Sequence, residues 1–331
     1  MIDPTQEETA GLSAEVVTPV GGPSEAAQRM LQDTEVPIVQ LGQWALVWRR
    51  FKRHHLALAG AITLGLLALM GIFAPLVSPE SFFGNWNFVA GPVPPRWTLP
   101  WNTDWRYIMG ADIQGHSLLM WIAYGARVSL SVGLLSSLLT MVIAIIVGAT
   151  AGYYGGWVDA VMMRISDIFL TLPFLPLLIL LADYAAGGNW VTIVFLFGVL
   201  SWPGAARLVR SYYLTFRVQE FTEAARAVGV SDTRIIYRHI LPNALSPLIV
   251  AATLNVAGFI IAEAAIDFLG VGIRQPAVSW GVALSNSQNY ILQGIWWWTF
   301  FPGLFLLITV LSFNFLGDGL RDALDVRSRA H

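Results

Sequence analysis

Long runs of apolar residues without a charged side chain recur along this 331-residue chain and constrain its fold more than any other feature. Five runs contain no Asp, Glu, Lys or Arg, and a sixth contains only Asp167. An α-helix rises about 1.5 Å per residue, so runs of roughly 17 to 24 residues can cross a hydrocarbon core of about 30 Å. We therefore predict six transmembrane helices, over about 56–77, 128–151, 165–182, 190–206, 244–262 and 296–317.

The composition of the chain favours the same fold class. Only 12 % of the residues are charged and 56 % are hydrophobic. This balance is typical of a membrane protein embedded in a lipid bilayer, and with the six predicted spans it gives an all-α, polytopic fold. The formal net charge of −2 provides no basic excess, so no nucleic-acid partner is predicted.

Several kinds of chemistry are excluded by the residue types present. The chain has no cysteine, and its five histidines show no metal-ligand spacing, so no metal site is expected. Lys52 is the only lysine, and no glycine-rich loop precedes it, so a phosphate-binding loop is absent. We expect the chain to hold no cofactor, to hydrolyse no ATP by itself and to have no enzymatic activity.

The N-terminal segment differs in composition from the rest of the chain. Residues 1–47 contain few large apolar residues and more acidic than basic ones, which predicts a disordered or weakly ordered tail. Residues 48–331 contain all the apolar runs and are expected to form one transmembrane domain, with an external loop over residues 78–127.

The placement of Arg and Lys predicts the orientation in the membrane. If the first helix enters from the cytoplasm, all but four of the 19 basic residues fall on the inner side, the exceptions being Arg96, Arg106, Arg127 and Arg274. Positively charged loops stay in the cytoplasm. Both termini are therefore predicted to be cytoplasmic.

The segment over residues 207–243 is unusually charged for this chain. Inserting its nine Asp, Glu and Arg residues into a bilayer would cost on the order of 20 to 30 kcal/mol, so the segment must lie outside the membrane. Within it, an apolar helical face is formed by Phe221, Ala224, Ala225 and Val228, which have i, i+3, i+4, i+7 spacing.

A turn and a second short helix are predicted after that face. Gly229 supplies a helix stop, since glycine readily adopts a left-handed conformation. Ser231 or Asp232 can cap the next helix through a side-chain oxygen, and Pro242 ends that helix or starts the next span. Its apolar face would hold Ile235, Ile236, His239 and Ile240. These faces would pack on the chain's own helices or against a partner protein.

This charged segment resembles a known sequence. Glu223-Ala224-Ala225, Gly229 and Leu241-Pro242 resemble the EAA loop of permease subunits of ABC importers. The stretch "RHILPN" is similar to the form found in the dipeptide/oligopeptide/nickel branch, of the second-permease type. The resemblance extends in order through "YGARVSLSVG", "AGYYGGWVDAVMMRISDI", "FLGVG" and "FNFLGDGLRDALDVR".

The resemblance implies the fold and the partners of the chain. It implies a type I ABC importer permease fold in the plasma (inner) membrane, a homologous second permease, two ATP-binding subunits that bind ATP and Mg, and an extracytoplasmic substrate-binding protein. The solute would be a di- or oligopeptide, with nickel or another small solute as the alternative. The residues implied to couple the permease to the ATPase are Glu223, Ala224, Ala225, Gly229, Ile240, Leu241 and Pro242.

The sequence departs from that branch before the predicted second span. Where the branch usually has Asp-Asp-x-Gly-Arg-Asp, this chain reads "ADIQGHS". It keeps Asp112 and Gly115 but has His116 and Ser117 in place of the usual Arg and Asp. The contacts that this run makes in the branch are therefore not predicted for the external loop of this chain.

Three acidic residues near the ends of spans are candidates for a pore or gate: Asp167, Glu263 and Asp267. Ionisable groups in spans tend to face a bundle interior or an aqueous cavity, although side chains at span ends also reach into the interface. An ion-coupled secondary transporter is the alternative of a different class, and it would need carboxylates in mid-span and an inverted repeat. Glu263 also begins a second Glu-Ala-Ala tripeptide, which lacks the following glycine.

Overall fold

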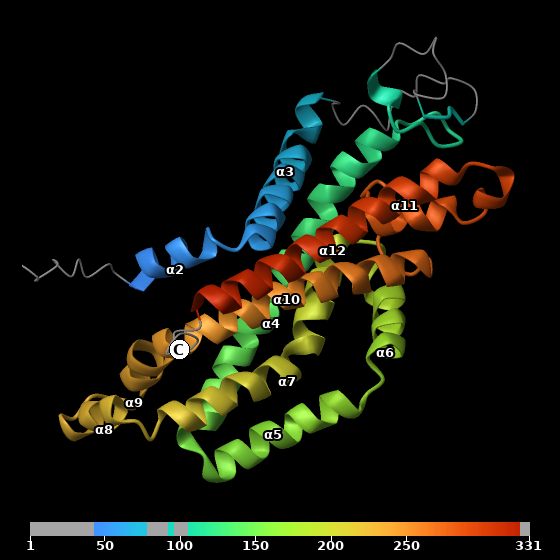
Figure 1. The fold of residues 1–331 in the computed structure, drawn as a ribbon. Coiled ribbons are helices and arrows are strands. Elements are labelled where there is room, and N and C mark those ends of the chain that lie inside the picture. Colours follow the sequence, from blue (N-terminus) through green and yellow to red (C-terminus); the bar gives the residue numbers. More distant parts are fainter. Residues whose placement is uncertain (1–42, 78–91, 96–104, 325–331) are drawn as a thin grey trace, which may run out of the picture. The chain divides into compact units, whose positions relative to one another are not determined.

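The computed structural model describes residues 43–77, 92–95 and 105–324 (Figure 1). The chain divides into two units, Met1–Leu46 and Val47–His331. Of the first unit only residues 43–46 are described, so the expected tail over residues 1–42 lies outside the described residues. The following account concerns the second unit.

The described residues form helices and contain no strand, which confirms the all-α fold class. The tail was expected to extend to residue 47, but residues 43–47 already belong to the first described helix. The long helices are α3 (His55–Val77), α4 (Leu118–Tyr154), α5 (Gly156–Thr171), α7 (Trp190–Phe216), α10 (Leu241–Phe268) and α12 (Trp296–Leu324). The shorter elements are α2 (Gln43–Phe51), η3 (Trp105–Tyr107), α6 (Phe174–Leu181), η4 (Ala182–Ala186), α8 (Glu220–Ala227), α9 (Asp232–Arg234), η5 (Ile235–Ile240), α11 (Trp280–Ser287) and η6 (Ile291–Gln293).

Five helical segments of the described chain are long and apolar enough to cross a membrane. They are α3, α4, α7, the continuous segment Asp232–Phe268, and α12, and the bent pair α5 and α6 gives a sixth crossing if it counts as one span. Six transmembrane helices were predicted from the apolar runs, and this number agrees with the upper value.

The predicted span over residues 165–182 is bent in the structure. The chain bends by 80° between α5 and α6. Leu172 has an extended backbone, with φ −74° and ψ 133°, because the ring of Pro173 disfavours a helical conformation in the residue before it. Hydropathy alone does not report this break, because Leu172 and Pro173 do not interrupt the apolar run.

Several helices extend beyond the charge-free runs that predicted them. α4 begins at Leu118, inside the expected external loop, and α7 continues to Phe216, inside the expected coupling loop. A charge-free run ends at the first charge, whereas a helix continues through a charged residue whose side chain is exposed, as Arg127 of α4 is, or paired. Arg210 of α7 is paired with Asp159 of α5, which it binds through two nitrogens.

The packing of α4 against α7 depends on glycines of α4. A Cβ atom at Gly148 would lie 2.4 Å from the carbonyl oxygen of Ala206, and one at Gly152 would lie 2.6 Å from the Cβ of Tyr213. Neither distance is possible for real atoms, so only glycine permits the two backbones to approach this closely. Small residues have the same role at helix contacts of many membrane proteins.

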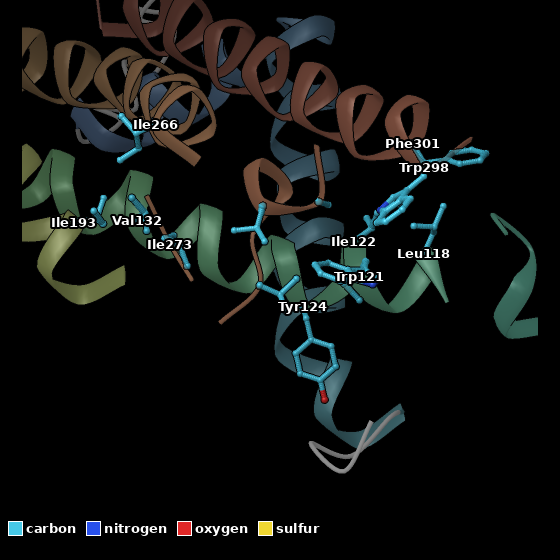
Figure 2. Packing of buried hydrophobic residues seen from close by; sticks show 14 of the residues in the cluster. Leu118, Trp121, Ile122, Tyr124, Val132, Ile193, Ile266, Ile273, Trp298 and Phe301 are labelled. Carbon is cyan, nitrogen blue, oxygen red and sulfur yellow. The ribbon is translucent and has the colours of Figure 1, made fainter. Parts of the chain in front are cut away.

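A large apolar cluster lies near the Leu118 end of α4 (Figure 2). Leu118, Trp121 and Ile122 of α4 are buried there with Trp298 and Phe301 of α12. Ile193 of α7 and Ile266 of α10 belong to the same cluster. The cluster therefore joins four of the long helices at one end, while the charged loop of residues 217–240 lies at the Tyr154 end of α4.

Candidate functional site

The charged loop between α7 and α10 contains a short helix with a well-formed end. α8 ends at Ala227, and Gly229 follows with φ +77°, in the left-handed region. The amide of Val230 donates to the carbonyl of Ala225 at 3.1 Å, and the amide of Gly229 donates to that of Arg226 at 3.0 Å. This is the Schellman pattern, in which two amides beyond the helix satisfy its last carbonyls. The predicted role of Gly229 as a helix stop is confirmed.

The predicted apolar face of α8 is divided in the structure. Ala225 is buried, but Ala224 is exposed and the side chain of Val228 is 79 % exposed. Thr222, three residues before Ala225 on the same side of α8, is also buried, and its hydroxyl donates to the carbonyl of Phe216 at 2.8 Å. α8 therefore packs on the protein along Thr222 and Ala225, and it leaves most of the predicted face open.

A second short helix was predicted for the second part of the loop, but the structure has no separate helix there. α9, the π-helical turn η5 and α10 form one continuous segment from Asp232 to Phe268. The amide of Leu241 donates to the carbonyl of Ile236, five residues earlier. Because this wider turn alters the bonding pattern next to Pro242, the helix continues past a residue that cannot donate.

The cap and the apolar face of that segment had different outcomes. Ser231 occupies the position before α9, but no side-chain hydrogen bond caps the helix. The carboxylate of Asp232 instead accepts a hydrogen bond of 2.6 Å from the hydroxyl of Tyr153. On the predicted face, Ile235, Ile236 and Ile240 are buried and His239 is half-buried.

Further contacts fix the loop to the ends of α4 and α7. Besides the bond from Tyr153 to Asp232, the hydroxyl of Tyr213 donates to the carbonyl of Ile236 at 3.1 Å. The guanidinium of Arg217 donates to the carbonyl of Gly152 at 3.2 Å, and that of Arg226 lies 5.8 Å from the ring centroid of Tyr153. The loop is thus a structured element seated on two spanning helices.

The residues implied to couple the permease to the ATPase fall into two groups. Ala225 and Ile240 are buried, and Leu241 is half-buried, so they hold the element together. The exposed group consists of Glu223, Ala224, Gly229 and Pro242.

Sequence reasoning missed Val218 and Tyr237, two exposed apolar side chains of the same element. Neither belongs to the residues that carry the resemblance. The only sequence signal that could have identified them is that each is an apolar residue within a charged loop.

Asp167, one of the three predicted gate residues, lies on α5. Its carboxylate forms an ion pair with Arg207 of α7, and both side chains are about half exposed. With the bidentate contact between Arg210 and Asp159, this pair ties α5 to α7. A role of Asp167 in a gate stays a prediction.

Glu263 and Asp267, the other two, are buried inside the helix packing at 0 % and 2 % exposure. They were expected at a span end, with access to the interface as one alternative, and that alternative is wrong. Asp267 accepts a hydrogen bond from the amide of Ile273 at 2.6 Å and another from the hydroxyl of Ser279. Ser279 caps α11, so Asp267 positions α11, while Glu263 accepts a hydrogen bond of 3.2 Å from the hydroxyl of Ser129 on α4. A gating role of either acid stays a prediction.

The unusual residues His116 and Ser117 are also buried, just before α4. The ring of His116 lies 2.6 Å, between Nδ1 and Oδ2, from the carboxylate of Asp112. That carboxylate also accepts a hydrogen bond from the indole of Trp121 at 3.2 Å. Asp112, which the branch also has, and His116, which stands where the branch has Arg, therefore belong to one compact turn. Within the described residues no group of three His, Asp or Glu could hold a metal ion.

A bundle of apolar spanning helices with a charged, anchored loop at one end is the architecture of a multi-pass membrane protein. Residues 144–330 match the family described as "Binding-protein-dependent transport system inner membrane component". Residues 42–92 match the N-terminal transmembrane domain of oligopeptide transport permease C. The chain belongs to this family of inner-membrane permease components, which confirms the resemblance drawn from its sequence.

Individual relatives cover most of the chain. The dipeptide transport system permease protein of Bacillus subtilis is 39 % identical over 85 % of each chain. The oligopeptide transport system permease protein of Haemophilus influenzae is 37 % identical over 86 % of this chain and 89 % of its own. The glutathione transport system permease protein of Pectobacterium atrosepticum is 34 % identical over 87 % of this chain and 92 % of its own.

Proposed function

We propose that this chain is one of two permease subunits of an ATP-driven importer of di- or oligopeptides. The observation that carries the proposal is the anchored loop, in which α8 projects Glu223, Ala224 and Val228 while Thr222 and Ala225 hold it to the spanning helices. When a bound partner moves, a helix fixed in this way passes the movement on to α4 and α7. A flexible loop would not.

The proposal assigns ATP and Mg to separate subunits. The sequence lacks a phosphate-binding loop, so the energy of hydrolysis must reach the permease through a protein contact. In this scheme α8 docks on the ATP-binding subunit, a second permease completes the path, and an extracytoplasmic binding protein delivers the solute. The peptide assignment is supported by the printed functions of the relatives, which include dipeptide and oligopeptide transport.

The experiment is purification of the chain from its native membrane in mild detergent, followed by reconstitution into vesicles. We expect two ATP-binding subunits and a second permease to co-purify, and we expect ATP-dependent uptake of a labelled dipeptide once the binding protein is added. The chain alone should hydrolyse no ATP above background. Uptake of a nickel salt without peptide uptake, or purification without any ATP-binding subunit, would contradict the proposal.

A further inference from the structure

The spanning helices border an open hollow that the candidate gate residues do not line. It has a volume of about 430 Å³ and lies between α4, α6, α7 and α10. This volume falls within the range of about 300 to 1,000 Å³ that is usual for binding pockets. We name it the α7–α10 hollow, after the helices that carry Ser201 and Asn255, two of its polar residues.

Polar side chains from three different helices line this hollow. They are Thr140 of α4, Ser201 of α7 and Asn255 of α10, and Asn255 lies at the centre of its spanning helix. Thr140 is 1 % exposed, and its hydroxyl has no hydrogen-bond partner among the described residues. A buried polar group without a partner is costly, so a group from outside the chain or water is expected to reach it.

Glycines keep the hollow open. Gly204 and Gly258 line it, and a Cβ atom at either would meet nothing within 4 Å. Gly148 and Gly152 are different, because there the missing Cβ is what permits contact between helices. At Gly204 and Gly258 a Cβ atom would contact no other described residue, so the small residue preserves space there.

We infer that the α7–α10 hollow is part of the surface along which the solute crosses the membrane, with Thr140, Ser201 and Asn255 exchanging hydrogen bonds with water and with the amide groups of a passing peptide. This inference rests on the proposed function for the identity of the solute. It assigns the path to uncharged polar groups, which bind amides weakly enough to release them. Asp167 and Asp267 are engaged in contacts within the chain, and Glu263 is bonded to Ser129 through one of its two carboxylate oxygens.

Cysteine accessibility tests the inference directly, because the chain has no cysteine of its own. Methanethiosulfonate reagents modify the thiolate, which forms only where water reaches the thiol. We compare Asn255→Cys with Leu307→Cys, an exposed apolar position of α12 outside the hollow, in the assembled importer. A small charged reagent should modify position 255 about 10-fold faster or more. Equal or slower modification would overturn the inference.

A matched pair of buried threonines provides a second comparison. Thr140 lines the hollow, whereas the hydroxyl of the equally buried Thr309 donates to the carbonyl of Phe305 at 2.7 Å. Thr140→Cys should react and Thr309→Cys should not. If a helix of the second permease fills the hollow, cysteines at 140 and 255 will stay unreactive in the assembled importer and will cross-link to that subunit, which also overturns the inference.

Filling the hollow tests its role in transport. Gly204→Leu should remove most uptake while the ATP-binding subunits still co-purify. Gly65→Leu is the control, because Gly65 of α3 also has open space beyond it but does not line the hollow. Normal uptake by the Gly204 variant would overturn the inference. Labelling is read without transport, so failure of the wild-type importer to take up peptide contradicts only the peptide assignment.

Discussion

Gly229 sets the angle between α8 and the segment that follows it. Its φ of +77° belongs to a region where a residue with a Cβ is about 1 to 2 kcal/mol less stable. Nothing lies within 4 Å of the position of that Cβ, so the cost of a substitution is confined to the backbone. A branched residue at 229 therefore alters the turn without filling space elsewhere.

We predict that Gly229→Val weakens association with the ATP-binding subunit and abolishes peptide uptake, while the chain still inserts into the membrane. The reason is that α8 loses its fixed direction. Association is measured by pull-down of the ATP-binding subunit. Gly294→Val is a matched control, because Gly294 has φ +85° and open space but follows η6, far along the chain from α8. Equal loss of association in both variants would count against the assignment of α8 as the coupling helix.

The conformation of Gly229 could be predicted from its sequence, because a glycine after an apolar helical pattern is a local signal. The inward position of Thr222 could not. Its hydroxyl is satisfied by the carbonyl of Phe216, a contact made only once α7 has continued past its charge-free run. The sequence left open whether Glu263 and Asp267 face the bundle interior or the interface, since their partners Ser129 of α4 and Ser279, which caps α11, come from other parts of the chain.

At the scale of elements, the loop over residues 217–240 is joined to α4 by few polar contacts. The bond from the hydroxyl of Tyr153 to Asp232, at 2.6 Å, connects the last turn of α4 with the start of α9. A hydrogen bond of this kind contributes about 0.5 to 1.5 kcal/mol. Its loss should loosen the α9 region without disrupting the spanning helices.

Tyr153→Phe should therefore raise amide hydrogen exchange in residues 228–235 by about 2- to 10-fold. Exchange in α4 and α7 should stay as in the wild type, and ATP-binding subunits should associate more weakly. The adjacent Tyr154→Phe is the control, because Tyr154 is exposed and its hydroxyl makes no hydrogen bond among the described residues. Unchanged exchange in residues 228–235 of the Tyr153 variant would show that this contact does not anchor the loop.

The elements themselves could be located from apolar runs, but their ends could not, and hydropathy does not report where a proline breaks a run. The run over residues 165–182 is continuous in hydropathy, yet Pro173 divides it by an effect on the backbone of Leu172. Pro242 does not break its helix, because the π turn η5 before it allows the helix to continue through this residue. The same residue type therefore breaks one segment and not another, and the difference depends on whether the neighbouring turn can rearrange.

At the scale of the whole molecule, the helices place two sets of exposed residues at different ends of α4. Val228 belongs to the loop that contacts Tyr153, near the C-terminal end of α4. Arg274 lies between α10 and α11. The indole of Trp280 in α11 donates to the carbonyl of Ile122, near the N-terminal end of α4. Most arginines of the described residues lie toward the Tyr153 end of α4, including Arg217, Arg226 and Arg234. Because basic loops stay in the cytoplasm, this end is proposed to be cytoplasmic.

Single cysteines test that orientation, and the chain offers two exposed positions for them. Val228 is 79 % exposed beside α8, and Leu292 is 96 % exposed in η6, on the connection between α11 and α12. In intact cells a membrane-impermeant thiol reagent should label Leu292→Cys and leave Val228→Cys unmodified, and Val228→Cys should become reactive once the membrane is opened. The physical reason is the cost of about 2.5 to 3.5 kcal/mol for each arginine carried into the bilayer, which keeps the arginine-rich end on the side of synthesis. Labelling of Val228→Cys in intact cells would invert the topology and would place the proposed ATPase-docking helix on the wrong side of the membrane.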